Sequence, residues 1–174
     1  MAFGTFDTHL NYHTVDENLM RHNATVMLYW GLATFTIGFM MQLFWLLPFM
    51  LGLFVFNFLI GLFVKQDFAP SIRIAKLFHK EKPQAIGAIQ KQFAWYLGLG
   101  LSLVSFSLSL FLQSNGELFT FLCGLCIFCN TILYFEAIFS FCVGCQLYKS
   151  AKAIGLVKEP KIEPKCMGNR CDST

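Results

Sequence analysis

Four apolar runs limit what this 174-residue chain can fold into. They cover residues 24–44, 46–64, 93–112 and 118–141. A helix needs about 20 mostly apolar residues to cross the hydrocarbon core of a bilayer, so each run has the length of a transmembrane helix. The sequence therefore predicts an all-α integral membrane protein, a four-helix bundle in the bilayer.

Composition supports this class. Hydrophobic residues make up 56% of the chain and charged residues 13%, and there are 21 phenylalanines. A soluble domain of this size cannot bury so many rings without leaving large apolar patches, whereas lipid accepts them on the outer faces of helices. The formal net charge of +3 is small, so we expect the lipid bilayer and not nucleic acid as a partner.

The connections between the runs predict two helical hairpins. The first two runs are separated by only a few residues, and Pro48 falls in the first turn of the second helix, where its missing N–H does no harm. Residues 113–117 join the last two runs and contain an Asn-Gly pair suited to a tight turn. We expect a polar arm over residues 1–23, a membrane domain over 24–150, and a flexible, basic, cysteine-containing tail over 151–174.

Basic residues predict the orientation, because short loops rich in Lys and Arg stay in the cytoplasm. Neither hairpin turn holds any of the 13 basic residues. The central loop and the tail hold all but one of them: Lys65, Arg73, Lys76, Lys80, Lys82 and Lys91, then Lys149, Lys152, Lys158, Lys161, Lys165 and Arg170. We expect a multi-pass protein of the cell inner (cytoplasmic) membrane with both termini in the cytoplasm.

The central loop is predicted to form a short amphipathic helix. Ile72, Ala75 and Phe78 recur at helical spacing, and Arg73 and Lys76 lie off that stripe. This pattern suits a helix that lies on the membrane surface.

Glu136 is the one carboxylate inside the predicted membrane-spanning runs. A charge there is costly unless it is protonated or paired, so Glu136 is a candidate functional residue. Arg21 enters the first helix from the same side of the membrane, and an Arg21–Glu136 ion pair is expected. Such a pair serves either catalysis or the locking of two helices together.

The seven cysteines fall into three sets. Cys123, Cys126 and Cys129 lie in the outer half of the fourth run and are interpreted as small core hydrophobes, with a ladder of soft metal ligands as the alternative. Cys142 and Cys145 form a C-x-x-C pair at the inner boundary. Cys166 and Cys171 lie in the tail.

The boundary pair is the leading site. In a reducing cytosol, C-x-x-C spacing favours metal binding or redox chemistry over a permanent disulfide. If the fourth helix ends near Phe141 and a new helix begins at the motif, Cys142 sits at a helix N-terminus that stabilises its thiolate; if the helix continues, both thiols are less acidic. Joined by Cys166 and Cys171, the pair alternatively supplies a four-thiolate metal site.

Several short stretches resemble one known family. They are R-H-N at residues 21–23, F-A-P-S-I-R at 68–73, K-Q-F at 91–93, and E-A-I-F-S-F-C-V-G-C-Q-L-Y at 136–148. Together they are similar to the bacterial and archaeal membrane family catalogued as Domain of Unknown Function 4395, over roughly residues 12–150. The resemblance implies a four-span membrane domain with an F-C-x-G-C motif. It implies no activity or cofactor.

Three functions remain open from the sequence. The first is a membrane thiol protein in which Cys142 and Cys145, supported by Glu136 and Arg21, exchange disulfides or handle sulfane sulfur. The second is binding or transport of copper or zinc by the same pair. The third is a non-catalytic subunit of a membrane complex. Because no quinone, haem or nucleotide motif is present, we expect a partner to exchange electrons with the pair: a thioredoxin-like protein, a sulfur-carrier protein or a larger membrane complex.

Overall fold

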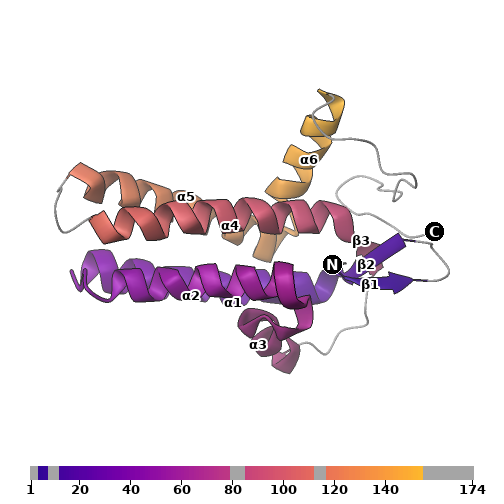
Figure 1. The fold of residues 1–174 in the computed structure, drawn as a ribbon, viewed down its shortest axis with the longest axis horizontal. Helices are drawn as coiled ribbons and strands as arrows, with labels where there is room; N and C mark the ends of the chain where they lie inside the picture. The colour runs from indigo at the N-terminus through magenta and orange to yellow at the C-terminus, as the bar shows by residue number, and fades with distance from the viewer. Residues whose placement is uncertain (1–3, 8–11, 79–84, 112–116, 155–174) are drawn as a thin grey trace.

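Four long helices lie side by side in the structure, a computed structural model that describes residues 4–7, 12–78, 85–111 and 117–154 (Figure 1). Two of the four continue as a π-helical turn at their C-terminal ends. The four are α1 (Glu17–Phe35) with its turn η1 (Thr36–Met40), α2 (Leu47–Leu59) with its turn η2 (Ile60–Val64), α4 (Ala88–Phe111), and α5 (Glu117–Phe139). Pro48 lies in the first turn of α2, as predicted.

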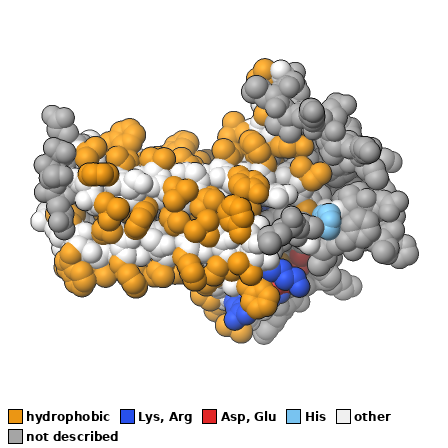
Figure 2. All heavy atoms as spheres, viewed as in Figure 1, with side chains coloured by type: hydrophobic (Ala, Val, Ile, Leu, Met, Phe, Trp, Pro, Cys, Tyr) orange, Lys and Arg blue, Asp and Glu red, His pale blue; other side chains and the backbone are white. Residues whose placement is uncertain are grey.

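Within the described part of the chain, three helical segments are long and apolar enough to cross a membrane: Leu47–Val64, Ala88–Phe111 and Leu118–Phe139. Their outward faces carry large exposed side chains such as Phe49, Leu110 and Phe121. Figure 2 shows hydrophobic side chains along the length of the bundle. The all-α class and the membrane-helix character predicted from the sequence are therefore supported.

The two hairpins pack against each other, with α1 along α5 and α2 along α4. Met27, Phe58 and Trp95 belong to one buried cluster, and the Phe58 and Trp95 rings meet edge-to-face with centroids 5.4 Å apart. A second cluster around Leu51 and Leu122 fills the other end of the bundle. Phe106 contacts both clusters, so the core is continuous along the helices.

A small antiparallel sheet ties together the starts of α1 and α4. Its strands, in spatial order, are β1 (Thr5–Asp7), β2 (Tyr12–Asp16) and β3 (Ala85–Gly87). Strand β2 leads directly into α1, where the Asp16 carboxylate accepts a hydrogen bond from the Asn18 N–H. Strand β3 leads directly into α4. This sheet was not predicted from the sequence, because strands of three to five residues carry too little alternation to be recognised.

The short helix predicted in the central loop is present as α3 (Pro70–Phe78), but part of its apolar stripe packs on the bundle. Ile72 and Ala75 are fully buried against protein, because α3 packs on α1, while Phe78 is exposed. Asn57 of α2 fixes the helix start, since its Oδ1 accepts a hydrogen bond from the Ser71 N–H at 3.0 Å. Helix α3 is therefore docked on the bundle. Ile72 and Ala75 face protein, whereas the prediction placed this helix on the membrane surface.

Candidate functional site

The chain breaks its helix just before the C-x-x-C pair. Helix α5 ends at Phe139, and Ser140 adopts a positive φ of 53° that turns the backbone out of the helix. A new helix, α6 (Val143–Ala153), then begins and rises away from the bundle (Figure 1). Of the two arrangements left open by the sequence, the structure shows the one in which a helix starts at the motif.

Cys142 occupies the N-cap position of α6. Its carbonyl accepts the first helical hydrogen bond, from the Gln146 N–H at 3.2 Å, and its Sγ accepts a hydrogen bond from the Cys145 N–H at 3.2 Å. The sulfur thus takes the place of the side-chain oxygen that usually caps a helix. Free N–H groups and the helix dipole stabilise negative charge at this end, so the position favours a thiolate when the pair is reduced.

Cys142 and Cys145 form a disulfide, with their Cα atoms 5.2 Å apart. Helix α6 is held in place against α4 by close packing beside this bond. Gly144, between the two cysteines, lies directly on Ala94, and the rings of Tyr148 and Phe93 meet at 5.5 Å between centroids. The pair is therefore built into a packed helix start.

Glu136 forms its ion pair with Lys91, and the predicted Arg21–Glu136 pair is wrong. The Lys91 Nζ lies 2.6 Å from the Glu136 Oε1, and the two side chains are 8% and 20% exposed. The sequence analysis placed Lys91 in the central loop. Helix α4 begins at Ala88, five residues earlier than predicted, which brings Lys91 into its first turn and toward α5.

Arg21 reaches the same junction but contacts backbone. Its Nε donates to the Ala137 carbonyl at 2.9 Å and its Nη2 donates to the Ile138 carbonyl at 3.3 Å. These carbonyls lie in the last turn of α5, which has no following turn to satisfy them and which carries partial negative charge. Arg21 therefore caps α5 just before the break that precedes Cys142.

The remaining cysteines are not brought to the pair in the described part of the chain. Cys126 is buried in the core cluster with Leu51 and Leu122, and Cys123 packs against that cluster, which agrees with their interpretation as core residues. Cys166 and Cys171 lie outside the described residues. Among the residues that are described, no group of three or more His, Cys, Asp or Glu side chains is arranged to hold a metal ion.

Lys91 was not predicted as a site residue, although it belongs to the K-Q-F stretch that resembles the family. The structure explains why three of the four stretches occur together. R-H-N supplies Arg21, K-Q-F supplies Lys91 and the Phe93 ring, and the last motif supplies Glu136 and both cysteines. All meet where α1 and α4 begin and α5 ends.

These features define a helical protein of membrane type with a disulfide at the N-terminus of its last described helix. The chain belongs to the family described as Domain of unknown function (DUF4395), whose model matches residues 15–153. No curated protein matches the chain, and no solved structure matches it.

Proposed function

We propose that this protein is a four-span membrane protein that exchanges disulfides with a partner protein through Cys142 and Cys145. Three of the spans are the apolar segments described above, and the remaining span, the first in the chain, is α1 with η1. It lies alongside α5 for its length, and its outward residues Tyr29 and Leu32 are exposed apolar side chains like those of the other three helices. A helix packed along a membrane-spanning neighbour occupies the same depth of the bilayer.

Both termini are proposed to be cytoplasmic, at the inner membrane. The sheet, α3 and the start of α6 gather toward one end of the bundle, and the end of α4 and the start of α5 lie at the other (Figure 1). Arg73 and Lys76 of α3 are exposed at the former end. Labelling of intact cells in a cysteine-depleted background tests this topology. We expect an impermeant maleimide to modify W45C in the first hairpin turn and to leave K76C unmodified, whereas the reverse pattern would invert the orientation.

The observation that carries the proposed chemistry is the placement of Cys142 as the N-cap of α6, one turn from Cys145. In the reduced protein the Cys142 thiolate attacks a disulfide of the partner, whose S–S bond breaks as the mixed disulfide forms. Cys145 then attacks the Cys142 sulfur, which closes the Cys142–Cys145 bond and releases the second partner thiol. The partner is reduced by two electrons and gains the two thiol protons.

Glu136 is assigned the transfer of a proton during this exchange. It lines the same cavity as Val143 and Gly144, the residues between the two cysteines, and its ion pair with Lys91 holds it there. Arg21 is assigned a positioning role, because it caps the end of α5 from which the motif departs. The same pair can resolve a persulfide on Cys142, in which case attack by Cys145 releases hydrogen sulfide.

Trapping of the mixed disulfide tests the exchange. We expect purified, reduced C145S protein to accumulate a covalent adduct with an oxidised thioredoxin-like protein on non-reducing gels, because nothing resolves the bond to Cys142. C142S should form little adduct, and C129S, a matched control on the neighbouring helix, should behave like the wild type. Equal adducts with C142S and C145S, or none with either, would contradict the proposal.

A further inference from the structure

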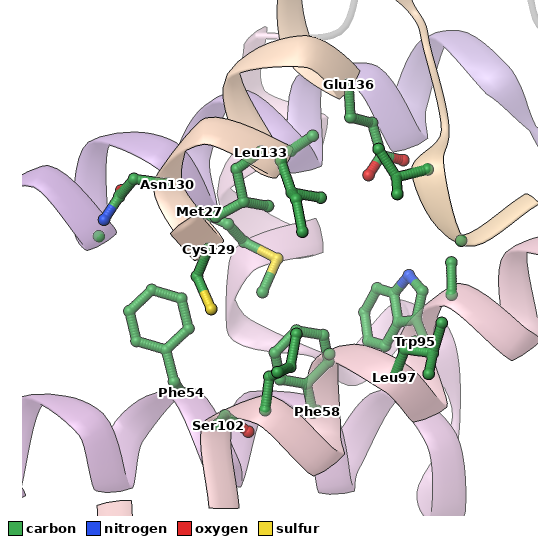
Figure 3. Close-up of a pocket in the computed structure, with 18 of the residues that line it drawn as sticks. Met27, Phe54, Phe58, Trp95, Leu97, Ser102, Cys129, Asn130, Leu133 and Glu136 are labelled. Atoms are coloured by element: carbon green, nitrogen blue, oxygen red, sulfur yellow. The ribbon is translucent and has the colours of Figure 1, made fainter. Parts of the chain in front are cut away.

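A cavity of about 380 Å³ lies inside the bundle, between α1, α2, α4 and α5 and against the start of α6 (Figure 3). Its volume falls in the range of small-molecule sites, about 300–1,000 Å³. The walls are mostly apolar and aromatic: Phe54 from α2 and Trp95 from α4 face the cavity from one side, and Leu133 of α5 lies across from them (Figure 3). Such walls accept a flat, apolar ring.

Among the polar residues of the lining, Glu136 and Asn23 carry groups that can orient a ligand. Glu136 of α5 lines it at the end near α6. Asn23 of α1 is 3% exposed, and its Oδ1 has no hydrogen-bond partner among the described residues. Its Nδ2 rests only on the Met27 Sδ at 3.5 Å, which is a weak acceptor. The buried amide therefore offers a ligand both an acceptor and a weakly held donor.

The cavity also borders the turn of α6 that carries the disulfide. Val143 and Gly144, which lie between Cys142 and Cys145, belong to its lining, as does Leu147 in the next turn of α6. Val143 directly follows Cys142 in the chain, and Gly144 directly precedes Cys145, so a molecule at this end contacts the sequence neighbours of both cysteines. The cavity thus extends from the interior of the bundle to the residues between the two cysteines.

We propose that this cavity binds the ring of a membrane quinone and that the quinone accepts the electrons of Cys142 and Cys145. The pair receives these electrons from a dithiol of the partner protein, by the exchange described above run in reverse. The electron-transfer part rests on the proposed thiol function. A quinone is soluble in lipid and has an apolar ring, and its oxygens change from hydrogen-bond acceptors to donors on reduction, which matches the two-sided amide of Asn23. An acyl chain would leave that amide unpaired, which costs free energy in a buried site.

The reaction balances within these components. The two cysteine thiols lose two protons and two electrons and form one S–S bond. The quinone takes up both electrons and both protons, and its two carbonyls become the hydroxyls of the quinol. Glu136 carries protons at the cavity end nearest the pair. The sequence shows no quinone motif because the lining residues come from five separate helices and share no short stretch of chain.

Binding is tested with full-length protein in lipid nanodiscs, with decylubiquinone as the probe and tryptophan fluorescence as the readout. We expect saturable quenching in the wild type and its loss in S102F, which fills the cavity from α4. L103F, which introduces the same residue at an outward position that is 43% exposed, should bind normally. N23L, nearly isosteric, should weaken binding about tenfold, since it deletes the hydrogen bonds to the ring oxygens.

Electron transfer is followed by the loss of quinone absorbance on mixing with reduced protein, which we expect for the wild type and not for C142S. Quenching that does not saturate, or binding by S102F that equals binding by the wild type, would overturn the quinone site. So would oleic acid that competes for the site as strongly as the quinone does. Quinone that binds but does not oxidise the wild-type dithiol would overturn the electron transfer. Failure of the proposed function is seen separately, as absence of the C145S adduct with the thioredoxin-like protein measured without quinone.

Discussion

Lys91 and Glu136 form an ion pair of 2.6 Å between the first turn of α4 and the last turns of α5. Both charges are largely removed from solvent, with the side chains 8% and 20% exposed. Each charge therefore depends on the other, because an isolated charge at such a position is costly. The pair fixes the end of α5 relative to α4 immediately before the helix break that presents Cys142.

Removal of one partner should destabilise the protein strongly. We expect K91M or E136L alone to lower the free energy of unfolding by about 3 kcal/mol, since each leaves a buried charge unpaired. The double variant K91M/E136L should lose much less than the sum of the two single losses. Chemical denaturation in detergent micelles, monitored by circular dichroism, measures the three values. Strictly additive losses would show that the two side chains do not interact.

Arg21 should stabilise the end of α5 through its hydrogen bonds to the Ala137 and Ile138 carbonyls. We expect R21M to lower stability by about 1–2 kcal/mol, because it removes a charged donor from the two carbonyls. R21K retains the charge and should lose less. Hydrogen exchange across residues 135–141 locates the effect, which should be faster exchange in R21M. Faster exchange confined to α1 would show that Arg21 does not cap α5.

Much of the fold followed from apolar run length and from a few turn residues. The second, third and fourth runs each correspond to a helix that is long and apolar enough to cross a membrane, and Pro48 marks the start of α2. The sheet was missed because its three strands are short. In addition, the pairing of β2 with β3 joins segments that are about 70 residues apart in the chain. No pattern within a single segment reveals such a pairing.

The candidate residues Glu136, Arg21, Cys142 and Cys145 were chosen from the sequence, which predicted their contacts only in part. Glu136 was recognised because a carboxylate in an apolar run stands out. Its partner was assigned by depth alone, and Arg21 and Lys91 enter the junction from the same end of the bundle. Which of them reaches the carboxylate depends on where α4 begins and how α1 is rotated. The cavity depends on the same tertiary details and has no signature in the sequence.

Gly144 should be needed for the seating of α6 on α4. A Cβ atom added at this position would lie 2.5 Å from the Ala94 Cβ and 2.7 Å from its Cα, so the two helices would have to separate. We expect G144A to cost about 1–3 kcal/mol, the usual range for overpacking. G124A is the matched control, because its new Cβ would meet nothing within 4 Å. Equal thermal stability of the two variants would contradict the packing of α6 on α4.

The five cysteines that the structure describes should differ in reactivity once the protein is reduced. Cys142 should react first with a limiting amount of iodoacetamide, about tenfold faster than Cys126, because a helix N-terminus stabilises its thiolate whereas Cys126 is buried among apolar side chains. Cys145, one turn into α6, should follow Cys142. Mass spectrometry of peptides from protein in nanodiscs gives the ranking, and C123S, which leaves α6 unchanged, should not alter it. If Cys126 and Cys129 are modified while Cys142 remains free, the start of α6 does not activate its cysteine, and the exchange chemistry assigned to the pair is wrong.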